Sequence, residues 1–117
     1  MELTNDELLF IYGWVDSFPL SGRKRNITHD FADGRNVAEI TKACFPLSID
    51  LRHYTSANSH ELREQNWNRL NEKVFRPLGF MVHKDDIQDI IHAEKGAIER
   101  VLLFLYSQFS QREDIMA

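Results

Sequence analysis

Apolar residues recur at intervals of three and four along most of the chain, which is the spacing of one face of an α-helix. In the first segment, Thr4 and Glu7 form a capping-box pattern, and apolar residues follow at positions 8, 11, 12 and 15. This pattern predicts an amphipathic helix over residues 5–17, with Trp14 reaching the core. Pro19 ends the segment because proline lacks the N–H group that a continuing helix needs.

The next helical pattern covers residues 35–44 and closes at Pro46, since the residue before a proline disfavours the helical conformation. Just ahead of it, we expect Phe31 to anchor a short segment to the core. We expect Asp33 to be the N-cap of the helix, because a carboxylate can accept hydrogen bonds from the first free N–H groups. Gly34 is expected where the backbone needs a conformation that other residues rarely adopt.

The strongest pattern in the centre of the chain predicts a long helix over residues 59–75. Trp67 and Leu70 lie on its apolar face, so both are predicted to be core residues. Pro77 and Gly79 follow the last apolar position and are expected to stop the helix.

Two helices are predicted in the last third of the chain. A short one covers residues 85–91, where two aspartates complement the helix dipole, and a final one starts near residue 95 and carries Leu102 into the core. No segment alternates with a period of two, so no strand is expected. The sequence therefore predicts a single all-α domain over residues 1–110, with four main helices and short connecting helices, followed by a frayed tail at 111–117.

Composition agrees with one globular domain. The chain has 117 residues, of which 43% are hydrophobic and 27% charged, and this is enough for one core. No stretch approaches the roughly 18 apolar residues of a membrane span, so none is predicted. The N-terminal residues are acidic, and Cys44 is the only cysteine, which excludes an intrachain disulfide. A reducing compartment, the cytoplasm or its ciliary extension, is expected.

Charge is unevenly distributed along the sequence. The formal net charge is −4, yet residues 21–84 hold eleven Lys or Arg against seven acids. Residues 1–20 hold four acids and no Lys or Arg, and residues 85–117 hold three cations against seven acids. A domain with this arrangement can present a basic face to a negative surface while remaining acidic as a whole.

The cations of the middle segment are the candidate binding residues. Three are adjacent in a loop that also contains turn-forming Ser, Gly and Asn, where they cannot be buried cheaply. Three others follow at spacings of four and three along the central helix and should share one exposed face. The full candidate set is Arg23, Lys24, Arg25, Arg35, Arg63, Arg69, Lys73 and Arg76.

No group of residues predicts catalysis. There is no Ser-His-Asp arrangement and no glycine-rich phosphate loop. Asp85, Asp86 and Asp89 have the spacing of a magnesium-diphosphate motif, but a second such motif is missing, so we interpret them as a helix start. His60 and Glu64 could share a metal, although zinc needs more ligands. We expect no enzyme activity, cofactor or metal, and the overall acidity argues against nucleic acid.

The order of these motifs resembles a calponin homology domain. An early helix bears Trp14, the block Asp30 to Gly34 precedes a second helix, and the long central helix carries Trp67 and Leu70. The finer match is to the sperm flagellar protein family, also called CLAMP, for calponin-homology and microtubule-associated protein. It is similar at Trp14-Val15-Asp16, Pro19-Leu20-Ser21, Lys24-Arg25-Asn26, Val37-Ala38-Glu39-Ile40, Phe45-Pro46, Ala57-Asn58-Ser59, Asn66-Trp67, Leu70-Asn71, Lys73-Val74, Leu78 and Phe80.

The resemblance implies a helical domain of a cilium or flagellum protein that binds tubulin and stabilises or bundles the microtubules of the axoneme. Family members are also expected to dimerise through a coiled coil, which this sequence does not contain. Two alternatives remain open at this point. Calponin homology domains more broadly include actin-binding modules, and the domain could instead be a scaffold that contacts another axonemal protein or dimerises.

Overall fold

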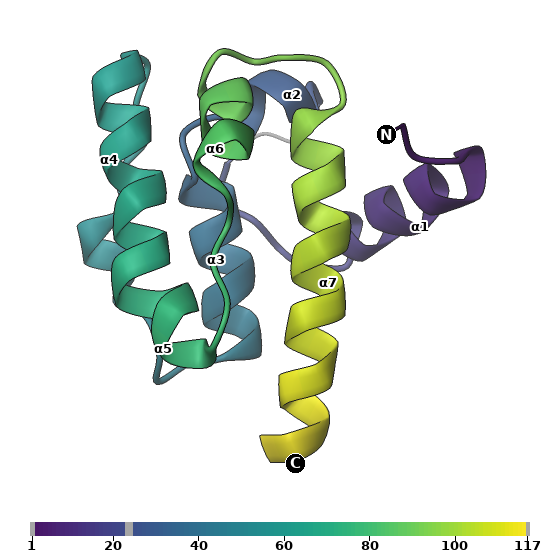
Figure 1. The fold of residues 1–117 in the computed structure, drawn as a ribbon, viewed down its shortest axis with the longest axis vertical. Helices are drawn as coiled ribbons and strands as arrows, with labels where there is room; N and C mark the ends of the chain where they lie inside the picture. Colours follow the sequence, from purple (N-terminus) through teal and green to yellow (C-terminus); the bar gives the residue numbers. More distant parts are fainter. Residues whose placement is uncertain (1, 23–24, 117) are drawn as a thin grey trace.

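The computed structural model describes residues 2–22 and 25–116, with side chains described through residue 112. Every regular element in these ranges is helical. The elements, in chain order (Figure 1), are α1 (Asn5–Asp16), α2 (Ile27–Asp30), α3 (Arg35–Cys44), the 3₁₀ turn η1 (Leu51–His53), α4 (His60–Leu70), the π-helical turn η2 (Asn71–Phe75), α5 (Arg76–Leu78), α6 (Lys84–Ile91) and α7 (Ala97–Met116). The all-α prediction is confirmed.

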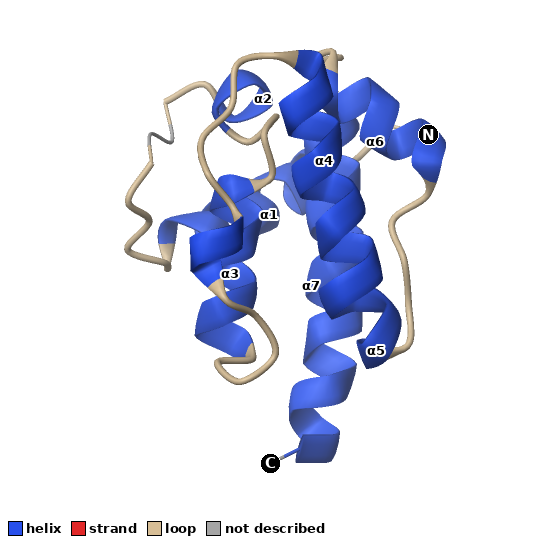
Figure 2. Ribbon diagram, turned by 90° about the vertical axis from the view of Figure 1, so that its left-hand side faces the viewer, coloured by secondary structure: helices blue, strands red, loops and turns tan. Residues whose placement is uncertain are grey.

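Helix α7 is the central column of the fold. In Figure 1 it stands between α1 on one side and α3 and α4 on the other. Figure 2 shows the same body from the side of α4, with α3 beside it and the loop after α1 at the left edge. Large side chains from all of these helices meet in one core, and Trp67, Phe31, Leu70 and Leu102 are each 0% exposed there, as the sequence predicts.

The first helix begins through the expected capping box. The Thr4 hydroxyl accepts a hydrogen bond from the backbone N–H of Glu7 at 3.1 Å, and the Glu7 carboxylate accepts one from the N–H of Thr4 at 2.9 Å. Trp14 is half-buried rather than enclosed, because α1 lies at the edge of the fold and its indole packs edge-on against Tyr106, with ring centroids 5.3 Å apart. Trp14 therefore covers the core instead of filling it.

The central helix is longer than predicted because a π-helical turn carries it past Pro77. The Arg76 N–H donates to the carbonyl of Asn71, five residues back, which widens the helix just before the proline. This widening relieves the clash that a proline ring makes with the carbonyl four residues earlier. Gly79 then ends the helix with φ of +103°, the left-handed conformation in which glycine is favoured.

Gly34, not Asp33, occupies the N-cap position of α3. Its φ of +79° lies in the left-handed region, which favours glycine. The residue also lies beside the central helix, where an added Cβ would be 3.4 Å from both Leu70 Cδ1 and Trp67 Nε1. Asp33, one residue earlier, still caps the helix, because its Oδ1 accepts a hydrogen bond from the Arg35 N–H at 2.9 Å. The prediction that Asp33 is the N-cap is therefore wrong by one position, although its carboxylate does accept a hydrogen bond from the first turn of the helix.

Helix α7 continues beyond residue 110, where the sequence placed the end of the domain. Arg112 is bound to the body of the fold. Its guanidinium lies 4.7 Å from the ring centroid of Phe80 and donates to the carbonyl of Leu78. The guanidinium thereby satisfies a carbonyl left free at the end of α5, so residue 111 and Arg112 belong to the domain rather than to a frayed tail.

Gly34→Ala should destabilise the protein by about 1–2 kcal/mol, because alanine pays for a left-handed backbone that glycine adopts freely. Gly13→Ala is the matched control. Gly13 lies within α1 with nothing within 4 Å of an added Cβ, so alanine there should be neutral or stabilise by roughly 0.5–1 kcal/mol. Urea unfolding of both variants measures the difference, and equal stability of Gly34→Ala and the parent protein would contradict the assignment.

Candidate functional site

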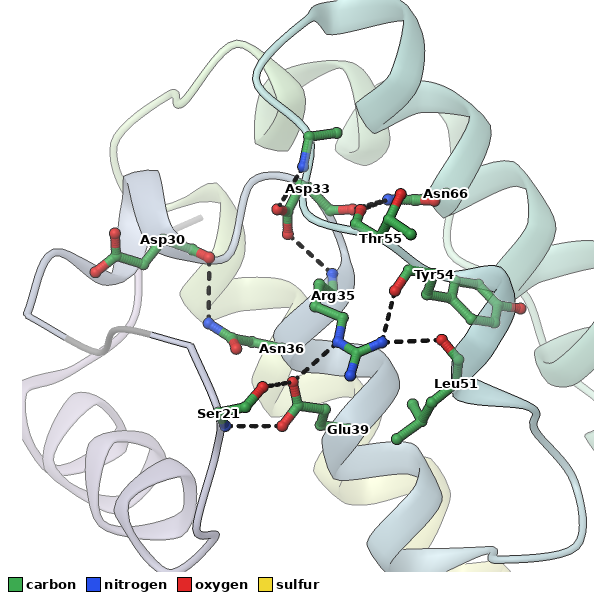
Figure 3. A network of polar contacts seen from close by, with 11 residues as sticks. Ser21, Asp30, Asp33, Arg35, Asn36, Glu39, Leu51, Tyr54, Thr55 and Asn66 are labelled. Atoms are coloured by element: carbon green, nitrogen blue, oxygen red, sulfur yellow. Dashed lines mark hydrogen bonds and ion pairs between the residues drawn. The ribbon is translucent and has the colours of Figure 1, made fainter.

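A polar network crosses the face of the molecule between the loop after α1 and the central helix (Figure 3). Arg35, on the first turn of α3, lies at its centre. The guanidinium donates to Glu39 Oε2 at 3.0 Å, to the carbonyl of Leu51 at 2.9 Å and to the carbonyl of Tyr54 at 2.6 Å. One side chain thus joins α3 to the segment around η1.

Glu39 extends the network to the loop after α1. Its two carboxylate oxygens accept hydrogen bonds from the N–H and the hydroxyl of Ser21, at 2.9 and 2.5 Å. Burial alone would raise the pKa of Glu39, but the hydrogen bonds from Ser21 and the interaction with Arg35 outweigh it and leave the pKa below its ordinary value. The carboxylate therefore stays ionised and fixes the start of the basic loop to α3.

Asp33 and Asn66 connect the other side of the network to the central helix. Asp33 Oδ2 accepts a hydrogen bond from the N–H of Ala57 at 3.0 Å. The Asn66 amide donates to the carbonyl of Asp33 at 2.9 Å and to that of Thr55 at 2.8 Å. Because these bonds satisfy backbone groups of the irregular segment before α4, they give this loop a defined path.

Two of the predicted binding cations are structural. Arg63 is only 7% exposed, and its guanidinium donates to the carbonyls of Ala57 at 3.2 Å and Ile91 at 2.9 Å. The expectation that Arg63 is available to a partner is wrong. Its side chain points from α4 into the interior, between the loop before α4 and the end of α6. Arg35 is half-buried, and the network occupies its guanidinium.

The other described candidates are exposed. Arg69, Lys73 and Arg76 lie at the C-terminal end of the central helix, on the face away from the core. Arg69 donates to the carbonyl of His53 at 2.5 Å, and Arg76 pairs with Glu72 at 3.3 Å while 67% of its side chain remains exposed. We call these three cations the helix cluster.

Arg25 is exposed in the loop after α1, whereas Arg23 and Lys24 lie outside the described residues. The three adjacent residues Arg23, Lys24 and Arg25 are called the loop cluster below. Figure 2 shows this loop and the central helix on one face, with α3 between them. Of the candidate cations, the structure therefore describes Arg25 in this loop and the helix cluster at the end of the central helix, with Arg35 and its network in α3.

Sequence reasoning missed one exposed cation on this face. Arg52 belongs to η1, and its side chain is 88% exposed. Its guanidinium pairs with Asp50 at 2.7 Å, and this pairing lowers the pKa of the Asp50 carboxyl below its usual range. The Asp-x-Arg spacing in the sequence could have indicated this pair. Because Asp50 neutralises the charge of Arg52, the pair adds little net positive charge to this face.

Neither metal-binding alternative from the sequence gains support in the described part of the chain, where no three His, Cys, Asp or Glu side chains are grouped to hold an ion. Glu64 accepts a hydrogen bond from Gln88 at 3.1 Å, and the His60 ring lies 4.3 Å from that of His92. Asp85 and Asp86 begin α6, as interpreted. Among the described helices, none is long and apolar enough to cross a bilayer.

Residues 11–107 match the family model described as a CH-like domain in sperm protein. The chain belongs to this family. It is 40% identical to sperm flagellar protein 1 of Bos taurus over 103 residues, 88% of this chain and 44% of that protein. It is 40% identical to the Mus musculus protein of the same name over 115 residues, and 37% identical to the Xenopus laevis protein over 113 residues, in each case 97% of this chain and 49% of the relative.

The CH-like match includes both basic clusters and the network between them, since all of these residues lie between positions 11 and 107. The resemblance recognised from the motifs around Trp14, Asp30 to Gly34 and Trp67 is therefore confirmed. The chain spans about half the length of the sperm flagellar proteins that it matches.

Replacing Arg63 with methionine should destabilise the CH-like domain by about 2 kcal/mol, because the change leaves two buried carbonyls without a donor. Arg76→Met makes the same substitution at an exposed arginine near the end of the central helix. It should change the free energy of unfolding by less than about 0.5 kcal/mol. Thermal and urea unfolding measure both. If Arg63→Met is as stable as Arg76→Met, the side chain is not structural.

Glu39 should also make stability depend on pH. Because its folded pKa lies below the ordinary value of 4.5, its contribution is fully present above that value and is lost as the pH falls through the folded pKa. Glu39→Gln should therefore be less stable than the parent protein at neutral pH, and the difference in unfolding free energy between the two proteins should shrink as the pH falls below 4.5. The exposed Glu61→Gln is the control, and a parallel pH profile for parent and Glu39→Gln would refute the assignment.

Proposed function

We propose that this CH-like domain binds microtubules, with its two basic clusters docked on the acidic outer surface of tubulin. The observation that carries the proposal is the outward position of Arg69, Lys73 and Arg76 on one end of the central helix. Cations in this position gain attractive energy from a negative surface without losing any internal contact that the core needs.

The polar network supports a two-point contact. The hydrogen bonds that Ser21 donates to Glu39 hold Ser21, two residues before the loop cluster in the sequence, against α3. The bond from Arg69 to His53 ties the helix cluster to η1, the element that Arg35 already joins to α3 through Leu51. Docking of the loop cluster together with the helix cluster would suit an extended partner such as a protein filament better than a small ligand, because both clusters could be in contact at once.

The relatives support the cellular setting. They are named sperm flagellar proteins, and the skeleton of a flagellum is built from microtubules. We infer that this chain acts in a cilium or flagellum, at the axoneme, where it stabilises or bundles microtubules. Bundling by one such domain needs a second contact, which dimerisation through a further segment of a longer protein would supply.

Co-sedimentation with stabilised microtubules tests the proposal through three variants with the same change of charge. Lys24→Glu/Arg25→Glu changes the loop cluster, Arg69→Glu/Lys73→Glu changes the helix cluster, and Lys84→Glu/Lys95→Glu changes two exposed cations outside both. Each cluster variant should bind at least about tenfold more weakly than the parent, a loss of about 1.4 kcal/mol. The control variant should bind within about threefold of it.

The salt dependence and the choice of polymer complete the experiment. Binding of the parent should weaken as salt is raised, because exposed charges are screened over about 8 Å at physiological ionic strength. An equal loss in all three variants would mean that net charge alone matters and would refute the docking surface. Pelleting with filamentous actin but not with microtubules would replace the proposal by an actin-binding function, and a stable dimer that binds neither polymer would indicate a scaffold.

A further inference from the structure

A second site lies on the other side of the fold, between the beginning of α1 and the first turn of α7. A pocket of about 450 Å³ opens there. Leu3, Leu8 and the ring of Tyr12 supply apolar wall, and Glu99 lines it from α7. In Figure 1 this end of α1 is at the opposite edge of the molecule from α4, so the pocket is separate from the helix cluster.

Glu99 is an unusual residue to find in such a place. It is 7% exposed, and only one of its carboxylate oxygens is satisfied: Oε2 accepts a hydrogen bond from the Tyr12 hydroxyl at 2.9 Å. Oε1 is buried and accepts no hydrogen bond from the residues that the structure describes. Burial, followed by this hydrogen bond and the charge of Glu99, raises the pKa of Tyr12, which keeps the hydroxyl a donor.

A buried carboxylate oxygen without a partner has lost its hydrogen bonds to water and has formed none in exchange. A ligand that donates a hydrogen bond to it is therefore stabilised, and a cationic donor forms the strongest such bond. The protein's own nearby cations do not meet this need. Lys95 and Arg100 also line the pocket, but Arg100 directs its guanidinium toward Asp89, at 3.9 Å, and neither cation reaches Glu99 Oε1, which accepts no hydrogen bond in the described part of the chain. The segment that forms the other wall is acidic, since residues 1–20 contain four acids and no Lys or Arg.

We propose that the Glu99 pocket receives a lysine side chain of a partner protein. Its four methylene groups would pack against Leu3 and Leu8, and its ammonium group would reach the Glu99 carboxylate. An ammonium carries three N–H donors, so it can bind Oε1 and still share Oε2 with Tyr12. Tyr12 is 38% exposed, and its ring, at the surface, is the wall that moves to admit the side chain.

The pocket adds a second kind of contact to the domain. The basic face would be engaged by a negative polymer while the opposite, acidic edge accepts a basic segment of another protein. The two contacts use different residues and different elements, so one can fail without the other.

Nuclear magnetic resonance titration of the ¹⁵N-labelled chain with a short acetylated and amidated Gly-Lys-Gly peptide tests the proposal. The backbone N–H of Gly96, which lines the pocket, should shift in a saturable way. The same peptide with Nε-acetyl-lysine has the same shape without the charge and should bind at least about tenfold more weakly. A saturable shift of equal affinity for both peptides would overturn the assignment of the ammonium, and no shift with either would mean that water alone fills the pocket.

Three variants locate the contact. Glu99→Gln should lose at least about tenfold in affinity for the lysine peptide, whereas Glu94→Gln, an exposed acid that does not line the pocket, should lose nothing. Leu8→Ala removes apolar wall from the pocket and should weaken binding of the lysine peptide by at least about threefold, which tests the site even if Glu99→Gln folds poorly. All three should pellet with microtubules as the parent does, so this proposal and the microtubule proposal can be rejected separately. Unchanged affinity of a folded Glu99→Gln would overturn the site.

Discussion

The attachment of the segment before α3 to the central helix is the contact on which the rest of the structure depends. The Trp67 indole donates to the carbonyl of Ala32 at 3.0 Å, and Asn66 donates to that of Asp33 at 2.9 Å. Such polar contacts in the interior leave little freedom, because each buried carbonyl needs its donor. They place Gly34 beside Trp67, with a φ of +79° that favours glycine over residues with a side chain.

The path of the irregular chain follows from that attachment. Once α3 is fixed against α4, Arg35 can reach the carbonyls of Leu51 and Tyr54, and Asp33 can reach the N–H of Ala57. The segment between α3 and α4 has little regular structure, so these side chains satisfy backbone groups that a helix would satisfy for itself. The helix cluster therefore lies next to a loop segment that these polar side chains hold in place.

Much of the fold could be predicted from the sequence because its signals are local. The capping box at Thr4, the apolar period around Leu70 and the glycine at position 79 each act within a few residues. The candidate site could be predicted only in part. Burial of Arg63 depends on the carbonyl of Ile91, 28 residues away, and nothing in the local pattern separates Arg63 from Arg69, which points outward. The continuation of the helix through Pro77 also depends on a π-helical turn, and no local sequence pattern predicts that turn.

The distribution of charge gives the domain a direction. Arg63 and Arg35 serve the fold, whereas Arg69, Lys73 and Arg76 at the end of the central helix and Arg25 in the loop after α1 are exposed. Helix α1, which carries Asp6, Glu7 and Asp16, lies at the opposite edge of the molecule from α4 (Figure 1). In the proposed complex, a negative surface would turn the molecule so that the exposed cations of the central helix meet it. The acidic edge would then face away from that surface, where a basic partner can reach it, and this makes simultaneous binding at the two sites physically consistent.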